Sequence, residues 1–273
     1  MRAIKKIHNR YRYSLILLKQ LVITDFKLRY QNSVLGYMWS LLRPLFLFGV
    51  LYVIFVIVLK TGGDVPYFGT YLLLGLVIWN FFTETTTGSV GLMVAKGDLL
   101  RKINFPRYII IISHSVSALI NFGLNMVVIG AVMIIAGAEP NHSAIWVPLL
   151  LVELYVFCMG LSFFLSALYV KFRDINFIWE VLVQMLFYAT PILYAFSFIT
   201  NKSETLGKIL MINPLAQIMQ SMRNGLVTDK TITSYDLFEG GWYAAIPIIL
   251  AIFAFIFGAL YFRKQSKTFA ENV

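Results

Sequence analysis

The chain has 273 residues, of which 59% are apolar and only 13% are charged, and its mean hydropathy is +0.76. A soluble fold needs roughly a quarter of its residues charged to solvate its surface, so this composition excludes an ordinary soluble domain and predicts a membrane protein. The 23 basic and 13 acidic residues give a formal net charge of +10. In a membrane protein this excess predicts an orientation rather than a nucleic-acid partner. One cysteine and three scattered histidines predict neither a disulfide framework nor a metal site.

Residues 1–35 are predicted to form a cytoplasmic N-terminus with an amphipathic helix at the membrane surface. Apolar side chains recur at helical spacing on one side of residues 15–30, and polar side chains gather on another. Lys19 and Asp25 interrupt the apolar stretch, and no small-residue cleavage site follows it. The segment is therefore not read as a targeting peptide.

Residues 36–262 carry the apolar runs. A bilayer-spanning helix needs about 20 mostly apolar residues, and six segments meet or approach this length. The predicted spans are about 37–59, 65–83, 108–137, 145–170, 177–200 and 241–262. Segment 203–225 holds a shorter apolar stretch broken by Asn213-Pro214, which favours a re-entrant segment. The sequence thus predicts an all-α polytopic membrane protein that ends in a tail over 263–273.

The basic residues support this count independently. With the N-terminus placed in the cytoplasm, most of the 23 basic residues fall on the cytoplasmic side of the six spans. This distribution obeys the positive-inside rule. Both termini are therefore expected in the cytoplasm.

No catalytic or energy-transducing motif stands out. The chain has no phosphate-binding loop, kinase-like set or zinc signature. Glu153 lies inside a predicted span, but no second intramembrane acid accompanies it to form a proton relay, which favours a packing role. The chain is therefore not expected to be an enzyme or to hold a cofactor, and nucleotide hydrolysis for uphill transport would belong to another chain.

Polar side chains recur every four residues along the third predicted span, at Ser113, Ser117, Asn121 and Asn125. Such a stripe lies on one face of a helix. It can mediate helix–helix association through small and polar side chains. The alternative is a hydrophilic wall for a passing polar substrate.

The cytoplasmic loop over 96–107 is a short basic amphipathic stretch that ends in Phe-Pro-Arg. Such a segment can dock into a groove on a soluble partner, whereas a simple positive-inside loop needs no apolar face. The residues assigned to docking are Asp98, Leu99, Leu100, Arg101, Lys102 and Ile103.

Five blocks in this order resemble the ABC-2 type polysaccharide export permeases. The first is residues 25–44 (DFKLRYQNSVLGYMWSLLRP), and the others are 101–107 (RKINFPR), 173–175 (RDI), 190–192 (TPI) and 213–215 (NPL). Members of this family export O-antigens, teichoic acids, capsules and related wall glycans on a polyprenyl diphosphate lipid.

The resemblance implies a homodimer in the bacterial cytoplasmic membrane, with two copies of a separate ABC ATPase that binds ATP and Mg. It also implies an interface helix over 11–30, a coupling helix over 97–104 and a re-entrant pair over 203–225. The first and fifth spans would line the conduit for the lipid-linked glycan.

Within that frame, Arg43 is the best-placed residue to bind the diphosphate, because a guanidinium binds phosphate oxygens in a bidentate way. The alternative is that Arg43 only anchors the helix by snorkelling to lipid phosphate. The aromatic residues expected to contact the sugars are Tyr37, Tyr52, Phe187 and Tyr188.

Two other functions remain open at this stage. An ABC-2 permease could export a small hydrophobic compound or a lipid, and a membrane scaffold of a glycan-synthesis complex would transport nothing. The sequence names neither the glycan nor the length of the polymer.

Overall fold

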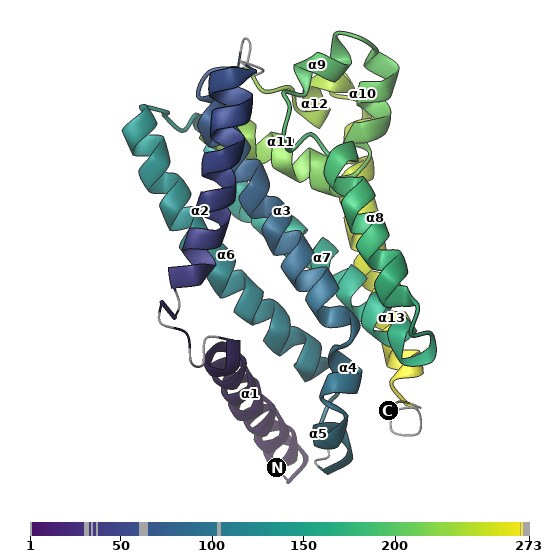
Figure 1. Ribbon diagram of the computed structural model, residues 1–273. Coiled ribbons are helices and arrows are strands. Elements are labelled where there is room, and N and C mark those ends of the chain that lie inside the picture. Colours follow the sequence, from purple (N-terminus) through teal and green to yellow (C-terminus); the bar gives the residue numbers. More distant parts are fainter. Residues whose placement is uncertain are drawn as a thin grey trace.

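The computed structural model describes residues 2–29, 33, 35–36, 38–59, 65–102, 105–267 and 269, with the backbone alone for 2–12 and 29. All regular secondary structure in these residues is helical, which confirms the all-α prediction (Figure 1). Tyr37 and Ile103, two of the predicted site residues, lie outside the described residues.

Four helical stretches among the described residues are long and apolar enough to cross a membrane. They are Met38–Val58, Tyr108–Ala136, His142–Lys171 and Trp242–Gln265. The first consists of α2 (Met38–Tyr52) and a π-helical continuation, Val53–Val58. The second is α6 (Tyr108–Ala136), and the other two contain α7 (Val147–Lys171) and α13 (Ile246–Gln265). Several such helices make this a multi-pass membrane protein.

Helix α3 (Phe68–Val90) forms the centre of the bundle and packs against α2, α6, α7 and α8. Most of its side chains are buried by these neighbours. Its second half is polar, which lowers its hydropathy relative to the four stretches above. The second span is predicted over 65–83, whereas α3 continues to Val90, and Asn121 of α6 donates a hydrogen bond to Glu84 inside the bundle.

Helix α8 (Ile175–Ala189) is shorter than the segment over 177–200 that the sequence predicts. Thr190 adopts an extended conformation (ψ 139°) directly before Pro191. A residue before proline is disfavoured in the helical region, so the prediction of a continuous helix to residue 200 is wrong. An irregular segment follows and leads into α9 (Ser197–Thr200).

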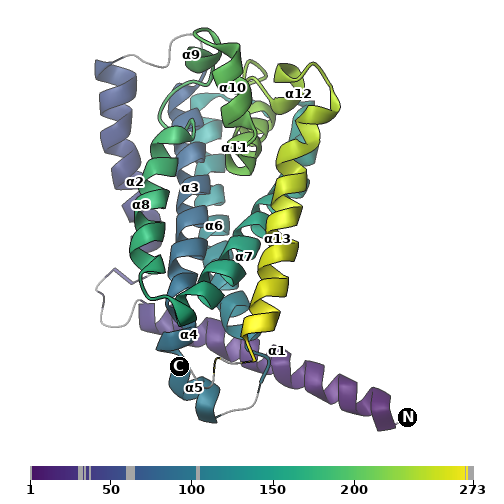
Figure 2. The same ribbon diagram turned by 90° about the vertical axis from the view of Figure 1, so that its right-hand side faces the viewer.

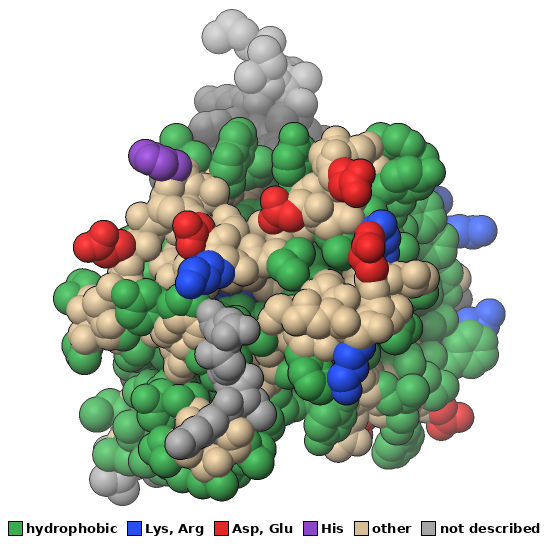
Figure 3. Space-filling model, turned by 90° about the horizontal axis from the view of Figure 1, so that it is seen from above, with side chains coloured by type: hydrophobic (Ala, Val, Ile, Leu, Met, Phe, Trp, Pro, Cys, Tyr) green, Lys and Arg blue, Asp and Glu red, His purple; other side chains and the backbone are tan. Residues whose placement is uncertain are grey.

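Helices α10 (Glu204–Met211), α11 (Pro214–Leu226) and α12 (Ser234–Leu237) gather with α9 at one end of the bundle (Figure 1). The side chain of Asn213 caps α11 by accepting a hydrogen bond from the Leu215 amide at 3.0 Å. Seen from this end, acidic and basic side chains are interspersed over the surface (Figure 3).

Helix α1 (Arg2–Arg29) lies across the opposite end, next to α4 (Leu92–Ala95) and α5 (Gly97–Lys102) (Figure 2). Leu21 and Phe26 of α1 are buried, and α1 packs on α6. An ion pair of 2.9 Å joins Asp25 to Lys96, between α4 and α5. A charged residue that interrupts the apolar face of α1 thus ties that helix to the segment predicted to dock a partner.

Helices α7 and α13 pack closely along their lengths. A Cβ atom added to Gly258 would lie 2.0 Å from the carbonyl oxygen of Gly160. Only glycine fits at this crossing, as is common where membrane helices approach each other closely.

Candidate functional site

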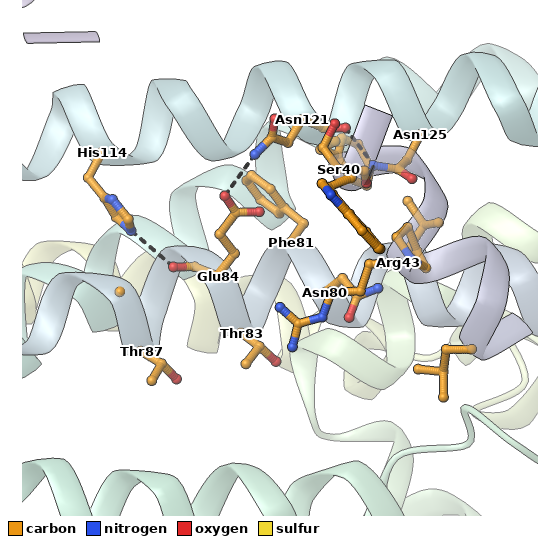
Figure 4. Close-up of a pocket in the computed structure, with 16 residues that line it drawn as sticks. Ser40, Arg43, Asn80, Phe81, Thr83, Glu84, Thr87, His114, Asn121 and Asn125 are labelled. Atoms are coloured by element: carbon orange, nitrogen blue, oxygen red, sulfur yellow. Dashed lines mark hydrogen bonds between the residues drawn. The ribbon is translucent and has the colours of Figure 1, made fainter. Parts of the chain in front are cut away.

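A polar cavity of about 640 Å³ lies between α2, α3 and α6 (Figure 4). Its position along the three helices places it inside the bundle, between the end that carries α1 and the middle of α3. The polar side chains that line it are Ser40, Arg43, Asn80, Thr83, Glu84, Thr87, His114, Asn121 and Asn125. Polar and ionisable groups within membrane segments commonly mark substrate paths.

Each helix contributes its polar side chains at helical spacing. Residues 80, 83, 84 and 87 share one face of α3, and residues 114, 121 and 125 lie along the facing side of α6. On α2, Ser40 and Arg43 are one turn apart and complete the cavity. The three helices therefore place one polar face each around a common space.

Hydrogen bonds between helices fix the wall that α3 and α6 share. Asn121 Nδ2 donates to Glu84 Oε1 at 2.9 Å, and His114 Nε2 lies 3.0 Å from the backbone oxygen of Glu84. Asn125 Nδ2 donates to the backbone oxygens of Asn121 at 2.8 Å and Ser40 at 3.4 Å. Three contacts therefore hold α6 to α3 and α2, and the Glu84 carboxylate accepts one of them.

Several polar groups in the cavity wall make no hydrogen bond or ion pair with a described residue. Among the described residues, the buried atoms Thr83 Oγ1, Thr87 Oγ1 and Asn121 Oδ1 have no hydrogen-bond partner. No described residue pairs with the guanidinium of Arg43, whose side chain is exposed to the cavity. Buried polar atoms are usually satisfied. The cavity therefore offers the Arg43 cation to an anionic molecule.

The polar stripe of α6 divides into two parts. Asn121 and Asn125 line the cavity, as a hydrophilic wall would. Ser113 and Ser117 are buried and donate hydrogen bonds within α6, to the backbone oxygens of Ile110 at 2.8 Å and Ser113 at 3.1 Å. These two serines serve helix packing and do not line the cavity.

The predicted aromatic residues lie elsewhere. Tyr52, on α2, contacts Phe48 with ring centroids 5.6 Å apart. Phe187, on α8, meets Trp79 edge to face at 5.4 Å, and Tyr188 beside it is 70% exposed. Since α2 and α8 flank α3 from different sides (Figure 1), a single chain does not bring Arg43 together with Phe187 and Tyr188.

The predicted docking segment forms helix α5, which the structure describes from Gly97 to Lys102. Asp98, Arg101 and Lys102 are exposed at the end of the molecule. Leu99 and Leu100 are half-buried and pack against the apolar cluster at this end of the bundle. The charged side chains, rather than the leucines, therefore form most of the accessible surface of α5.

Arg223 lies in the segment 203–225, which the sequence predicts to be re-entrant, and its burial is not predicted from the sequence. It is fully buried in α11, with its guanidinium carbon 3.5 Å from the centroid of the Tyr71 ring. Its nitrogens donate to the backbone oxygens of Tyr71 at 3.0 Å, Pro191 and Ile192 at 3.1 Å. Burial lowers the pKa of Arg223 to about 10, so the group stays charged at neutral pH. Arg223 thus fastens the irregular segment after α8 to α3.

Sequence reasoning also missed the α3 face of the cavity. The predicted second span ends at residue 83 because the uncharged run stops before Glu84. The helical spacing of Asn80, Thr83, Glu84 and Thr87 was the available signal.

A family model described as ABC-2 type transporter matches residues 16–227. The chain is similar to an O-antigen export system permease protein RfbA of Klebsiella pneumoniae, with 31% identity over 248 residues that cover 90% of this chain and 91% of that protein. A second RfbA from the same species is 31% identical over 252 residues, with the same coverage. RfbA of Myxococcus xanthus is 29% identical over 270 residues, which are 99% of this chain and 100% of that protein. The similarity thus extends over nearly the whole chain.

Proposed function

The chain belongs to the ABC-2 type transporter family, and we propose that it exports a polysaccharide linked to a polyprenyl diphosphate lipid across the cytoplasmic membrane. It is a transport component rather than an enzyme. A separate ABC ATPase, present in two copies, binds ATP and Mg and drives a homodimer of this chain.

The observation that carries the proposal is similarity over almost the full length to permeases named for O-antigen export. Polysaccharide export is favoured over export of a small hydrophobic compound by the character of the cavity. Most of the cavity surface is apolar, but the Arg43 cation and the polar side chains beside it suit a substrate with a charged group better than a wholly apolar one.

Arg43 is proposed to bind the diphosphate as the lipid-linked glycan enters. Its guanidinium has no described partner, and Asn80 and Thr83 line the same cavity (Figure 4). Charge-assisted and bidentate hydrogen bonds from guanidinium to phosphate are among the strongest available in proteins. Asn121 donates a hydrogen bond to the Glu84 carboxylate in the wall of the same cavity.

Six spans with both termini in the cytoplasm are proposed as the topology. The four long apolar helices are accompanied by α3 and α8, which run alongside them (Figures 1 and 2). The pair α10 and α11 is proposed as the re-entrant segment on the outer side. Clustered basic side chains at the end with α5, against scattered ones at the other end (Figure 3), support this orientation.

The homodimer and its conduit are proposed on the basis of two apolar faces that a single chain leaves uncovered. Helix α8 exposes Phe177, Val181, Met185 and Tyr188, and the first span exposes a comparable set. A second copy would place these faces opposite each other and bring aromatic side chains to the sugars. The exposed charges of α5 are proposed to contact the ATPase.

The proposal is tested in the source bacterium. A strain without this chain should lose surface polysaccharide and accumulate the lipid-linked polymer inside, and the wild-type gene should restore export. At equal protein level, Arg43→Ala should not restore it, whereas Glu139→Ala, at an exposed position just after α6 at the opposite end of the molecule, should. Normal surface polysaccharide in the strain without the chain would overturn the proposal.

A further inference from the structure

We propose that a second pocket, at the end of the bundle that carries α5, binds the phosphate headgroup of an anionic phospholipid. The pocket has a volume of about 510 Å³ and lies between the start of α6, α7 and the end of α13. It is separate from the polar cavity, with which it shares no lining residue. The inference goes beyond polysaccharide export, because its ligand is a resident lipid and not the transported molecule.

The pocket lies where two apolar helices end together. Helix α6 begins at Tyr108 and α13 ends at Gln265, and both belong to the stretches long enough to span a membrane. Their shared end therefore lies at the level of the lipid headgroups. Figure 2 shows α13 on the outside of the bundle at this end, where lipid can reach it.

Three cations line the pocket: Arg107, Arg263 and Lys267. No acidic residue is among the described residues that line it. Arg107 directly precedes α6 and lies 6.0 Å from the ring centroid of Phe269, which is buried. The positive end of the α6 dipole adds to the field of these side chains. Basic pockets between membrane helices on the cytoplasmic side suit anionic lipid headgroups.

The remaining lining is apolar. Phe163 and Phe262 meet with ring centroids 5.2 Å apart and form the floor, and Ala259 leaves space beside them. This floor distinguishes the pocket from a site for a free inorganic ion, which needs no apolar surface.

The side chains on the exposed face of α13 change from apolar to basic toward the C-terminal end of the helix. This order matches a phospholipid, whose apolar acyl chains end at an anionic headgroup. Ile256 and Leu260 are 51% and 60% exposed, and Arg263 and Lys267 follow them. Ile256, Leu260 and Arg263 are spaced 4 and 3 apart, so they share one side of α13, and Lys267 lies two residues beyond the end of the helix. An acyl chain can therefore lie along Ile256 and Leu260 while its phosphate reaches the cations. A zwitterionic lipid such as phosphatidylcholine carries the same phosphate, but the cations repel its quaternary ammonium, so it gains less from this contact.

The test measures lipid retention by the full-length protein in detergent micelles, with native mass spectrometry. Phosphatidylglycerol and phosphatidylcholine with identical acyl chains are titrated separately. The pocket variant is Arg107→Gln with Arg263→Gln and Lys267→Gln. The matched control, Lys171→Gln with Arg173→Gln and Lys264→Gln, removes the same charge at the same end from residues that do not line the pocket.

The wild type and the control should retain phosphatidylglycerol in preference to phosphatidylcholine. The pocket variant should bind phosphatidylglycerol at least about tenfold more weakly, since each cation near the headgroup contributes to attraction. Ala259→Trp, which keeps every charge and fills the pocket, should also weaken retention. Millimolar inorganic phosphate should not displace the lipid.

Three results would overturn the inference. The first is an equal loss of phosphatidylglycerol in the pocket variant and the control, which would indicate a general effect of net charge. The second is equal retention of both lipids by the wild type. The third is displacement by inorganic phosphate, which would indicate a site for a free anion.

Discussion

Replacing Arg223 by Met tests whether one buried guanidinium holds the end of the bundle together. Methionine keeps much of the side-chain volume and removes every donor. The backbone oxygens of Pro191 and Ile192 accept hydrogen bonds from Arg223, and no backbone amide of the described residues outside regular helices donates to them. Both would be left buried and unsatisfied.

The expected loss in the free energy of unfolding follows from these two backbone oxygens. A buried acceptor without a partner costs about 1–3 kcal/mol, so the pair costs about 2–6 kcal/mol. Loss of the contact with the Tyr71 ring adds to this, while relief from burying a charge offsets part of it. A net loss of about 2–5 kcal/mol lowers the unfolding temperature by about 5–15 °C in a chain of this size.

The assay is thermal unfolding of the purified protein in detergent, followed by tryptophan fluorescence. Arg223→Lys keeps the charge but cannot direct three donors at fixed angles, so it should unfold between the wild type and Arg223→Met. Leu206→Ala, at an exposed position of the neighbouring helix α10, is the control and should match the wild type. An Arg223→Met protein that unfolds within about 2 °C of the wild type would refute the reasoning.

Two further predictions concern topology and the ATPase. Because Cys158 is fully buried, it should react little when an impermeant thiol reagent is added to intact cells. Under these conditions the cysteine of Asp229→Cys should react. The cysteine of Asp98→Cys should react only after the cells are permeabilised. The reverse pattern would contradict the orientation. Arg101→Glu with Lys102→Glu should lower co-purification of the ATPase by about tenfold, because these exposed charges form the accessible surface of α5. Unchanged co-purification at normal protein level would show that α5 is not the contact.

Much of the bundle could be predicted because apolar runs are a local signal. The helix predicted over 108–137 extends over Tyr108–Ala136 in the structure, since lipid demands a long uncharged run there. The same rule failed for α3, which other helices surround, so that Glu84 can be accommodated inside the bundle by Asn121. Hydropathy indicates which residues can face lipid. It therefore predicts the extent of a helix poorly when other helices, rather than lipid, surround that helix.

Two other differences between the predicted and the observed structure have distinct causes. The end of α8 at Ala189 could have been predicted, because Pro191 is visible in the sequence and disfavours a helical Thr190. The burial of Arg223 could not, because its partners Tyr71 and Pro191 are brought to it only by the fold. A basic residue in a short segment is ordinarily exposed, and nothing local marks this one as an exception.

The central claim is that this chain moves a lipid-linked polysaccharide. The most direct measurement is reconstitution of the chain with its ATPase in proteoliposomes, with ATP hydrolysis and translocation followed as polyprenyl diphosphate-linked glycan is added. If the chain moves a lipid-linked polysaccharide, this glycan should stimulate both ATP hydrolysis and translocation. The Arg43→Lys protein should lose the stimulation and keep the basal rate of hydrolysis. Stimulation by a small hydrophobic compound but not by the lipid-linked glycan would contradict it.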